Sequence, residues 1–487
     1  MDYKKRSIKK LNLSNSYEEI DTRLATGWYV DSAGLNKEKK YKTKEVSFKI
    51  SKKSKFGNNC QFKANSVVSG QVSIGDDFYL GENSVVGCQG FGIATDGEKN
   101  IQIIHIGGVE VGIHNLSVNI SKMGNQVFVI CPWQANFMPN KCDLPYKIIA
   151  LPPKFFYLVR FFRLPPIRLI YLIYYYILNQ IYKPDFWHIS MSYPAGFSFL
   201  PFAKLCSPNY LVRSVGVDIQ INKDTAYGYR ISDNINNLFL KEFRNIKNHV
   251  AASSCLELEY KKLGVGKNQI HRISNGVQLQ RFEINKSSLD NKNDRFIRLV
   301  SVGRNEPKKN YKNLINSFEI LQAKSKNKYK LKIIGSGVEN LRKYLSKESI
   351  PYVELIEPKN YSSGIKFKEI YSLPSLDIIN AYLNADIFVF SSLIESFGIV
   401  VLEAMAAGLP IIAFDVLGIN ELVKNEFNGI LVEPNNNIQF ANAIRSISTK
   451  TVIERMSKNS LQLSKKYDYR NIANKYLNLY QKIINEK

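Results

Sequence analysis

Short apolar runs that alternate with helical stripes constrain the fold of residues 101–487 more than any other feature of the chain. In the first unit, IQIIHI (101–106) reads as a strand, GGVE as a tight glycine turn and QVFVIC as the next strand. Between the turn and the second strand, apolar residues recur at helical spacing: Val109, Ile113, Leu116, Ile120 and Met123. This β–turn–α–β order is typical of a doubly wound parallel sheet.

The same alternation continues in two series. The first comprises FWHI near 188, YLVRSVG near 213, HVAASS near 251 and IHRISNG near 272. The second comprises IRLVSVG (297–303), YKLKIIGSG (329–337), ADIFVFSS (385–392), LPIIAF (409–414) and NGILVE (428–433). Between them, residues 278–296 are polar and lack periodicity, which indicates a linker. The sequence therefore predicts an α/β fold with two doubly wound, Rossmann-like domains, 101–280 and 281–487, and the last helix could cross back to the first domain.

Residues 44–100, which follow an N-terminal extension of residues 1–43, carry a six-residue repeat. Apolar residues occupy every sixth position: Phe56, Phe62, Val68, Ile74, Leu80 and Val86. This period predicts a coil of short flat strands with glycine or asparagine at the corners. The segment resembles the left-handed β-helix of hexapeptide-repeat acyltransferases, and GFGIATDGEKNIQIIHIGGVEVG resembles the N-acyltransferases of the lipid A pathway.

That resemblance leaves two further interpretations open, an acyltransferase and a coil that assembles as a trimer. The repeat fades after about residue 91, so fewer turns remain than such enzymes need. The one nearby histidine, His105, fits a strand or its edge better than a catalytic site. An acyltransferase is therefore the less favoured function.

Composition excludes several classes of protein. With 45% hydrophobic residues, 28 Tyr and 27 Phe, the chain can bury large cores. Six cysteines without C-x-x-C spacing argue against a disulfide framework or a zinc site and fit a reducing cytoplasm. The first residues lack the apolar stretch of a secretory signal. The net charge of +25 shows no dense Lys/Arg stripe, so no nucleic-acid partner is expected.

The segment 152–182 is crowded with aromatic residues. Its longest uncharged apolar run, Leu169 to Leu178, is well short of the ~20 residues that a spanning helix needs. Aromatic residues next to Lys154, Arg160, Arg163 and Arg168 favour a helix that lies on an anionic membrane surface. The alternative is a helix buried in the first domain.

The stretch ESFGIVVLEAMAAGLP (395–410) places two carboxylates around a short apolar helix. Glu395 follows a buried strand, at the edge where open α/β sheets bind ligands. Ser396 is predicted to cap the helix, and Gly398 allows an anion to approach its N-terminal N–H groups. A carboxylate at Glu403 is costly among apolar neighbours unless it faces a cleft or a polar partner.

This arrangement resembles the E-x7-E motif of retaining glycosyltransferases with the GT-B fold, family four. Further motifs recur in the family's order: GGVE (107–110), YPAG (193–196), GVDIQ (216–220), NGV (275–277), VGRNEPKKN (302–310), GSG (335–337), LGINE (417–421) and NGILVEP (428–434). The resemblance implies a nucleotide-sugar donor, a polysaccharide or lipid-linked glycan acceptor at the cytoplasmic membrane face, and no metal or other cofactor. It also implies front-face transfer with retention and no protein nucleophile.

The resemblance also implies roles for individual residues. Arg304 and Lys309 would neutralise the departing diphosphate, and Glu395 would hold the donor sugar. Glu403 would accept hydrogen bonds from the ribose. The remaining predicted contacts are the glycine loops Gly107–Gly108 and Gly335–Gly337, the amides around Phe397 and Gly398, and Asp218, which would contact acceptor or donor.

The first domain departs from the family pattern at two positions. His188 matches the first of two family histidines, but Ser190 stands where the second is expected. Val215 likewise precedes GVDIQ where many relatives carry histidine. His188 alone fits a packed core as well as a site. A non-catalytic sugar-binding or scaffold protein therefore stays open as a third function.

Overall fold

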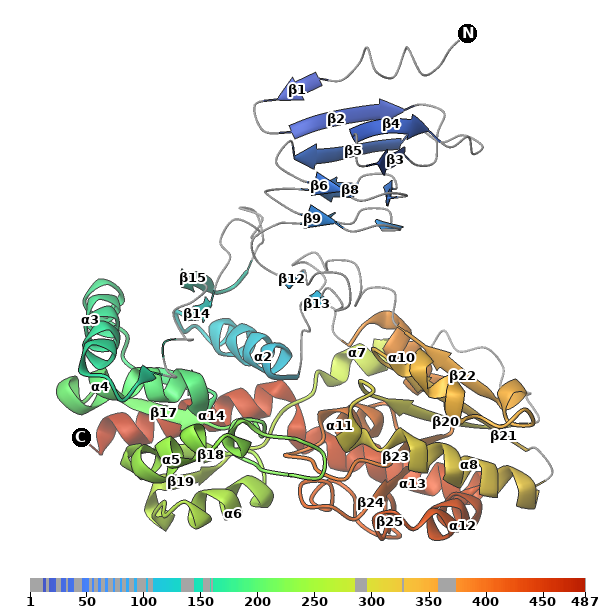
Figure 1. The fold of residues 1–487 in the computed structure, drawn as a ribbon. Coiled ribbons are helices and arrows are strands. Elements are labelled where there is room, and N and C mark those ends of the chain that lie inside the picture. Colours follow the sequence, from blue (N-terminus) through green and yellow to red (C-terminus); the bar gives the residue numbers. More distant parts are fainter. Residues whose placement is uncertain are drawn as a thin grey trace. The chain divides into compact units, whose positions relative to one another are not determined.

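The computed structural model describes residues 108–132, 144–151, 158, 161–284, 296–325, 328–357 and 374–486, together with the backbone of short strands between residues 12 and 103. Two compact units are distinguished. One comprises Met1–Ile106, Trp133–Pro139 and Lys359–Ile370, and the other comprises Gly107–Pro132, Asn140–Pro358 and Tyr371–Lys487. Figure 1 shows the order of the elements along the chain.

The first unit contains only strands among its described residues. They are β1 (Asn12–Ser14), β2 (Tyr17–Thr22), β3 (Trp28–Asp31), β4 (Gly34–Glu38), β5 (Val46–Ser51), β6 (Lys55–Phe56), β7 (Cys60–Phe62), β8 (Ser66–Val68), β9 (Ser73–Ile74), β10 (Tyr79–Leu80), β11 (Val85–Val86), β12 (Gly92–Ile93) and β13 (Gln102–Ile103). Four pairs are parallel, β5 with β8, β6 with β9, β7 with β10 and β8 with β11, and each joins residues 18 positions apart. The side chains of the six-residue repeat lie outside the described residues.

The strand predicted at IQIIHI differs in the structure. Within this run the structure describes Gln102–Ile103, which form β13, and β13 pairs antiparallel with β12 instead of joining a parallel sheet. The parallel neighbour of β14 (Phe128–Pro132) is β15 (Lys147–Leu151). Apolar alternation predicted a strand at 101–106 but could not identify its partner, because pairing depends on segments outside the run.

The first lobe of the second unit is a parallel sheet in the order β16–β17–β18–β19 with helices around it. Its strands are β16 (Trp187–Ser190), β17 (Tyr210–Arg213), β18 (His249–Ala251) and β19 (Ile270–Arg272). Its helices are α2 (Gly108–Lys122), α3 (Pro165–Tyr182), α4 (Phe197–Cys206), α5 (Asp233–Glu242) and α6 (Ser254–Lys262). All four strands lie where the apolar runs predicted them, and β17 and β18 are buried throughout.

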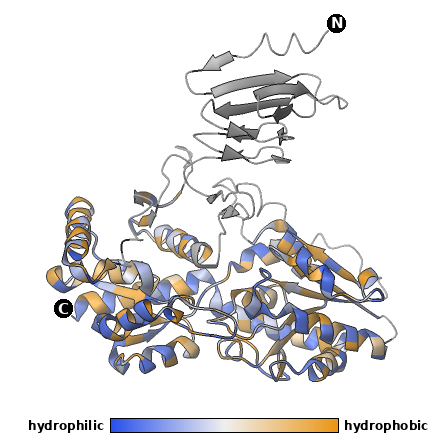
Figure 2. Cartoon of the chain, viewed as in Figure 1, coloured by the Kyte–Doolittle hydropathy of each residue, from blue (hydrophilic) through white to orange (hydrophobic). Residues whose placement is uncertain are grey.

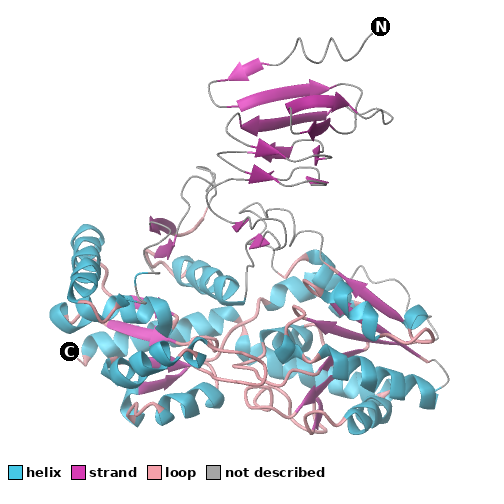
Figure 3. Cartoon of the chain, viewed as in Figure 1, coloured by secondary structure: helices cyan, strands magenta, loops and turns pink. Residues whose placement is uncertain are grey.

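The second lobe contains a six-stranded parallel sheet in the order β22–β21–β20–β23–β24–β25. Its strands are β20 (Ile297–Val302), β21 (Tyr329–Ile334), β22 (Val353–Ile356), β23 (Ile387–Phe390), β24 (Ile411–Phe414) and β25 (Gly429–Val432). Its helices are α7 (Leu279–Ile284), α8 (Tyr311–Ser325), α10 (Leu376–Leu383), α11 (Ile399–Ala406), α12 (Asn437–Ile447) and α13 (Lys450–Ser464). Figure 3 shows helices flanking this sheet. The order reverses between β20 and β23, which is the switch point where doubly wound folds bind ligands.

Helix α14 (Tyr469–Asn485) returns to the first lobe. Its buried residues Ile472, Ala473 and Tyr476 share a hydrophobic core with Leu116 of α2 and Leu211 of β17. A helix has one apolar stripe, and the first lobe supplies the surface that covers it.

Two local predictions need correction. The linker expected at 278–296 begins with helix α7, whose Phe282 is buried; residues 285–295 lie outside the described part. Strand β22 at the sheet edge was not predicted, because VELI is short and half-buried and gives a weak periodic signal.

Candidate active site

The predicted carboxylate Glu395 lies in the loop between β23 and α11. Gly398 precedes the helix with a left-handed φ of 83°, and α11 begins at Ile399. The prediction that Ser396 caps this helix is wrong, because its hydroxyl donates to the Val215 carbonyl oxygen of the first lobe at 3.0 Å. Glycine at 398 is required for a second reason, since a Cβ there would lie 2.5 Å from the side chain of Ile419.

Glu395 forms an ion pair with Lys309, with 2.6 Å between Nζ and Oε1. The two side chains are only 12% and 10% exposed, and Ser392 donates a hydrogen bond to the same Oε1 at 3.0 Å. Burial on its own would raise the pKa of Glu395. Attraction from Lys309 and then Lys308 outweighs it and lowers the pKa, so the carboxylate is ionised at neutral pH.

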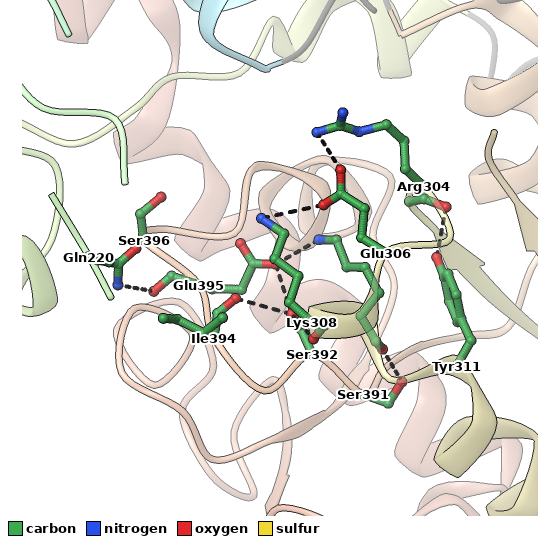
Figure 4. Close-up of polar contacts among 12 residues, drawn as sticks. Gln220, Arg304, Glu306, Lys308, Tyr311, Ser391, Ser392, Ile394, Glu395 and Ser396 are labelled. Atoms are coloured by element: carbon green, nitrogen blue, oxygen red, sulfur yellow. Dashed lines mark hydrogen bonds and ion pairs between the residues drawn. The ribbon is translucent and has the colours of Figure 1, made fainter. Parts of the chain in front are cut away.

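Basic side chains gather around this ion pair, as Figure 4 shows. Arg304 contacts Glu306 at 2.9 Å, and Lys308 lies 3.8 Å from the same carboxylate. Three cations thus face two acids, which leaves an excess of one positive charge among these five side chains. Such a cluster at the switch point attracts an anion. Sequence reasoning singled out Arg304 and Lys309 but missed Lys308, which lies between them in the same motif.

The predicted glycines differ in what the structure shows of them. A Cβ on Gly335 would lie 1.9 Å from the Gly303 carbonyl oxygen, so the loops after β20 and β21 touch through their backbones. Gly337 has a left-handed φ of 75° beside Asn305. Gly108 is the first residue of α2, and Gly107 lies outside the described residues.

Glu403 faces a polar partner, as a carboxylate on this helix requires. Tyr382 of α10 donates to its Oε2 at 3.1 Å, and Arg281 of α7 is close enough to attract it. Burial raises the pKa of Glu403 to about 7, although both neighbours oppose that rise. Phe397 is buried, with its ring 5.8 Å from that of Tyr467, so its side chain packs in the protein interior.

Asp218 is fully buried under the first-lobe loops. Its carboxylate accepts backbone N–H groups from Ser192 at 2.6 Å, Val215 at 2.9 Å and Gly216 at 3.0 Å. Burial raises its pKa, and these hydrogen bonds oppose the rise. This geometry favours a positioning role, in which Asp218 holds two loops in place, over direct contact with a substrate.

His188 lies against α14. Its Nδ1 forms a hydrogen bond of 2.6 Å with the Tyr480 hydroxyl, and burial lowers its pKa to about 3, helped by Arg213. A neutral imidazole in this place fits the packed-core interpretation. Ser190 is the last residue of the same strand, β16. The hydrogen bonds described for Val215 involve its backbone: its N–H donates to Asp218 and its carbonyl oxygen accepts from Ser396.

Loops from both lobes meet at Glu395. Gln220 donates to its carbonyl oxygen at 3.3 Å, and Ser253 donates to the carbonyl oxygen of Ser396. Next to them, Glu421 accepts a hydrogen bond from Ser254 and pairs with Arg272 at 2.6 Å. The structure thus brings Lys309, Glu395 and the loop above Asp218 together. The partners of Glu403 are instead Tyr382 of α10 and Arg281 of α7.

In the described residues, no cluster of three or more His, Cys, Asp or Glu side chains is arranged to hold a metal ion. Among the described helices, none combines the length and apolarity that a membrane span requires.

Comparison with known proteins matches both lobes to glycosyltransferase families. The model described as "Glycosyltransferase Family 4" matches residues 106–281, and "Glycosyl transferases group 1" matches residues 281–462.

Among curated relatives, an uncharacterized glycosyltransferase of Methanocaldococcus jannaschii is 32% identical over 44% of this chain and 54% of its own length. The UDP-Gal:alpha-D-GlcNAc-diphosphoundecaprenol alpha-1,3-galactosyltransferase of Escherichia coli is 33% identical over 42% of this chain and 51% of its own. The chain spans about half the length of these relatives.

Solved structures share the fold at low sequence identity. A glycosyltransferase from Rickettsia africae has a TM-score of 0.59 at 16% identity, covering 78% of this chain and 97% of that one. The sucrose-phosphate synthase of Thermosynechococcus elongatus has a TM-score of 0.59 at 18% identity, covering 78% and 94%. With two parallel-sheet lobes and two family models matched in tandem, residues 106–462 form a glycosyltransferase module of the GT-B fold.

Proposed function

We propose that this chain is a retaining, metal-independent glycosyltransferase that moves a sugar from a nucleotide-sugar donor to a polysaccharide or lipid-linked glycan in cell-envelope synthesis. The observation that carries this proposal is the ion pair of Lys309 with Glu395 beside Arg304, at the sheet's switch point and in contact with the first lobe. Fixed cations next to an ionised carboxylate are what a sugar diphosphate requires.

The reaction breaks the bond between the anomeric carbon and a phosphate oxygen, and the bonding electrons leave with the diphosphate. Arg304 and Lys309 would meet this growing negative charge, which is the role a metal ion has in other transferases. The acceptor oxygen would attack from the same face and pass its proton to the departing phosphate. Retention of configuration follows from that front-face path.

Glu395 would hold the donor sugar. Because its pKa is lowered, the carboxylate accepts hydrogen bonds from sugar hydroxyls at neutral pH. Lys309 and Ser392 fix its Oε1, so the other oxygen, Oε2, remains for the sugar. Glu403 would accept hydrogen bonds from the ribose hydroxyls. These hydroxyls would take the place of water, which burial keeps away from the carboxylate.

The relatives support a UDP-sugar and a lipid-linked acceptor. The similar enzyme of Escherichia coli is named for UDP-galactose and a diphosphoundecaprenol acceptor. The Anabaena protein HepE, solved in complex with UDP-glucose, has a TM-score of 0.55 at 14% identity with this chain. UDP is therefore the first nucleotide to test.

We also propose that α3 attaches the first lobe to the cytoplasmic face of an anionic membrane. One side of this helix packs on the lobe through Tyr171, Tyr175 and Leu178. The rest of the helix exposes large apolar residues: Leu169, Ile170, Ile173, Tyr176, Ile177 and Ile181. Leu164, directly before the helix, is exposed as well. Figure 2 shows hydrophobic residues along α3. Exposed Arg163 and Lys183 flank the helix and suit acidic headgroups.

Vesicle sedimentation tests this attachment. Wild-type protein should sediment with vesicles that contain anionic phospholipid, and Ile173→Glu with Ile177→Glu should stay in the supernatant. Leu258→Glu, at an exposed leucine of α6, is the matched control and should sediment like wild type. Equal sedimentation of the double variant would remove α3 as the contact.

For the N-terminal segment we propose a short left-handed β-helix. The four parallel strand pairs joined at 18 residues support it, because three hexapeptides complete one triangular coil. A chain that starts at residue 101 should keep transferase activity if this coil is an accessory. Light scattering of the intact and shortened chains tests whether the coil forms a trimer.

A donor screen tests the central proposal. Thermal stabilisation by UDP-, GDP- and ADP-sugars should identify one nucleotide, and donor hydrolysis or transfer should follow for that sugar. Glu395→Gln and Lys309→Met should lower turnover at least about 100-fold, since each removes a charge from the reacting centre. Full turnover by either folded variant would contradict the site, and absence of stabilisation by any nucleotide would contradict the function.

A further inference from the structure

Tyr227 of the first lobe lies over a lysine of the second. The Lys308 ammonium is 4.2 Å from the centre of the Tyr227 ring, well within the range of a cation–π contact. Tyr227 closes a small hairpin, in which Asn222 and Tyr227 exchange backbone hydrogen bonds at 2.9 Å. The two side chains therefore come from loops of different lobes, each held in place by its own backbone.

Lys308 is held more firmly than a surface lysine. Its carbonyl oxygen accepts hydrogen bonds from the Leu393 N–H at 2.8 Å and the Ser392 hydroxyl at 3.1 Å. Its side chain is 14% exposed, and this burial lowers the pKa of the ammonium while Glu395 opposes the fall. A cation is costly at such a place unless charge or a ring stabilises it.

Tyr227 also lies within electrostatic reach of the site. Burial raises the pKa of its phenol, and the charges of Glu395, Asp218 and Glu306 raise it further. The Glu395 charge acts on the Tyr227 phenol, and the Tyr227 ring contacts Lys308, so Tyr227 borders the cluster that contains Arg304 and Lys309. Figure 4 shows the second-lobe members of this cluster.

We propose that Lys308 is a third cation for the donor diphosphate and that Tyr227 is the positioning residue that aims it. This inference rests on the proposed function and deepens it. The diphosphate site is then complete only when the first lobe's hairpin is in contact with the second lobe, which couples lobe contact to charge neutralisation.

The selectivity that follows is for diphosphate over monophosphate. A monophosphate carries less charge, and Arg304 and Lys309 suffice for it. A charge-assisted contact stabilises by about 1.5–3 kcal/mol, which corresponds to about 10- to 100-fold in affinity. Loss of Lys308 should therefore weaken UDP binding at least about tenfold and UMP binding much less.

The test compares UDP and UMP affinities by calorimetry for wild type, Lys308→Met, Tyr227→Leu and Tyr227→Phe. Lys308→Met and Tyr227→Leu should reduce the UDP-to-UMP preference, and Tyr227→Phe should keep it, because phenylalanine retains the ring face. Lys330→Met is the matched control: its ammonium lies 4.3 Å from the Phe296 ring, and Lys330 stands near the amino-terminal end of β21, whereas Lys308 follows the carboxyl end of β20. The preference of this variant should be unchanged.

The outcomes separate the two proposals. If wild type binds no nucleotide, the proposed function fails. If wild type binds UDP and both Lys308→Met and Tyr227→Leu keep its preference, the role proposed for Lys308 and Tyr227 is overturned and the proposed function stands. If Lys308→Met does not fold, as judged by its melting curve, the comparison of Tyr227→Leu with Tyr227→Phe decides, because either outcome of that pair supports or refutes a role for the ring.

Discussion

Glu403 offers the sharpest test of the site's electrostatics, because its pKa is raised from 4.5 to about 7. One pKa unit is worth about 1.4 kcal/mol, so ionising Glu403 in the folded protein costs about 3 kcal/mol more than in the unfolded chain. Below about pH 4.5 the carboxyl is protonated in both the folded and the unfolded chain, so this penalty is absent. It grows as the unfolded chain ionises above pH 4.5, and it reaches its full value once the pH passes about 7. Wild type should thus lose stability over that window.

Glu403→Gln removes the charge and keeps an oxygen that can accept from Tyr382. At pH 8 the variant should be about 3 kcal/mol more stable than wild type, and at pH 5 the difference should fall below about 1 kcal/mol. For a lobe of this size, the difference at pH 8 corresponds to a melting temperature roughly 6–12 °C higher.

The measurement is thermal unfolding of both proteins at pH 5, 6, 7 and 8. Glu454→Gln, at an exposed position of α13, is the control and should follow the wild-type profile. Parallel profiles for wild type and Glu403→Gln between pH 5 and 8 would refute the reasoning, since they would show that burial does not disfavour the ionised carboxylate.

Four further outcomes are expected. Ribose hydroxyls favour ionised Glu403, so nucleotide affinity should rise from pH 6 to 8 in wild type and stay flat in Glu403→Gln; calorimetric titration checks this. Asp218→Ala deprives three backbone N–H groups of their acceptor and should cost at least about 3 kcal/mol in denaturant unfolding; an unchanged midpoint would contradict it. Gly398→Ala forces an L-residue to φ 83° and should cost at least about 1–2 kcal/mol and weaken nucleotide binding. Glu421→Ala removes the bond to Arg272 and should separate the unfolding transitions of the two lobes in calorimetry; an identical thermogram would count against that contact.

Much of the fold was predictable from local patterns. The runs at 297–303 and 385–392 are buried strands because each packs between neighbours, and burial leaves the same apolar signature wherever the partners lie. The sequence likewise placed Glu395 in a loop and Glu403 on the helix that follows, because the two belong to one continuous segment. Their roles in a site stay predictions. At β22 the periodic signal was too weak, so that strand was not predicted. At IQIIHI the pairing depended on a partner strand outside the run, and the predicted parallel pairing was wrong.

The sequence by itself determined most of the strands and helices, the two-lobed class of fold and the charged residues Lys309 and Glu395, which form an ion pair at the switch point. Only the tertiary structure decided that Lys308 lies against Tyr227, that Ser396 bonds to Val215 and that Arg281 faces Glu403. The physical reason is range: secondary structure follows from neighbours a few residues away, whereas charge, burial and hydrogen bonding depend on distances in space between segments about 80 to 180 residues apart.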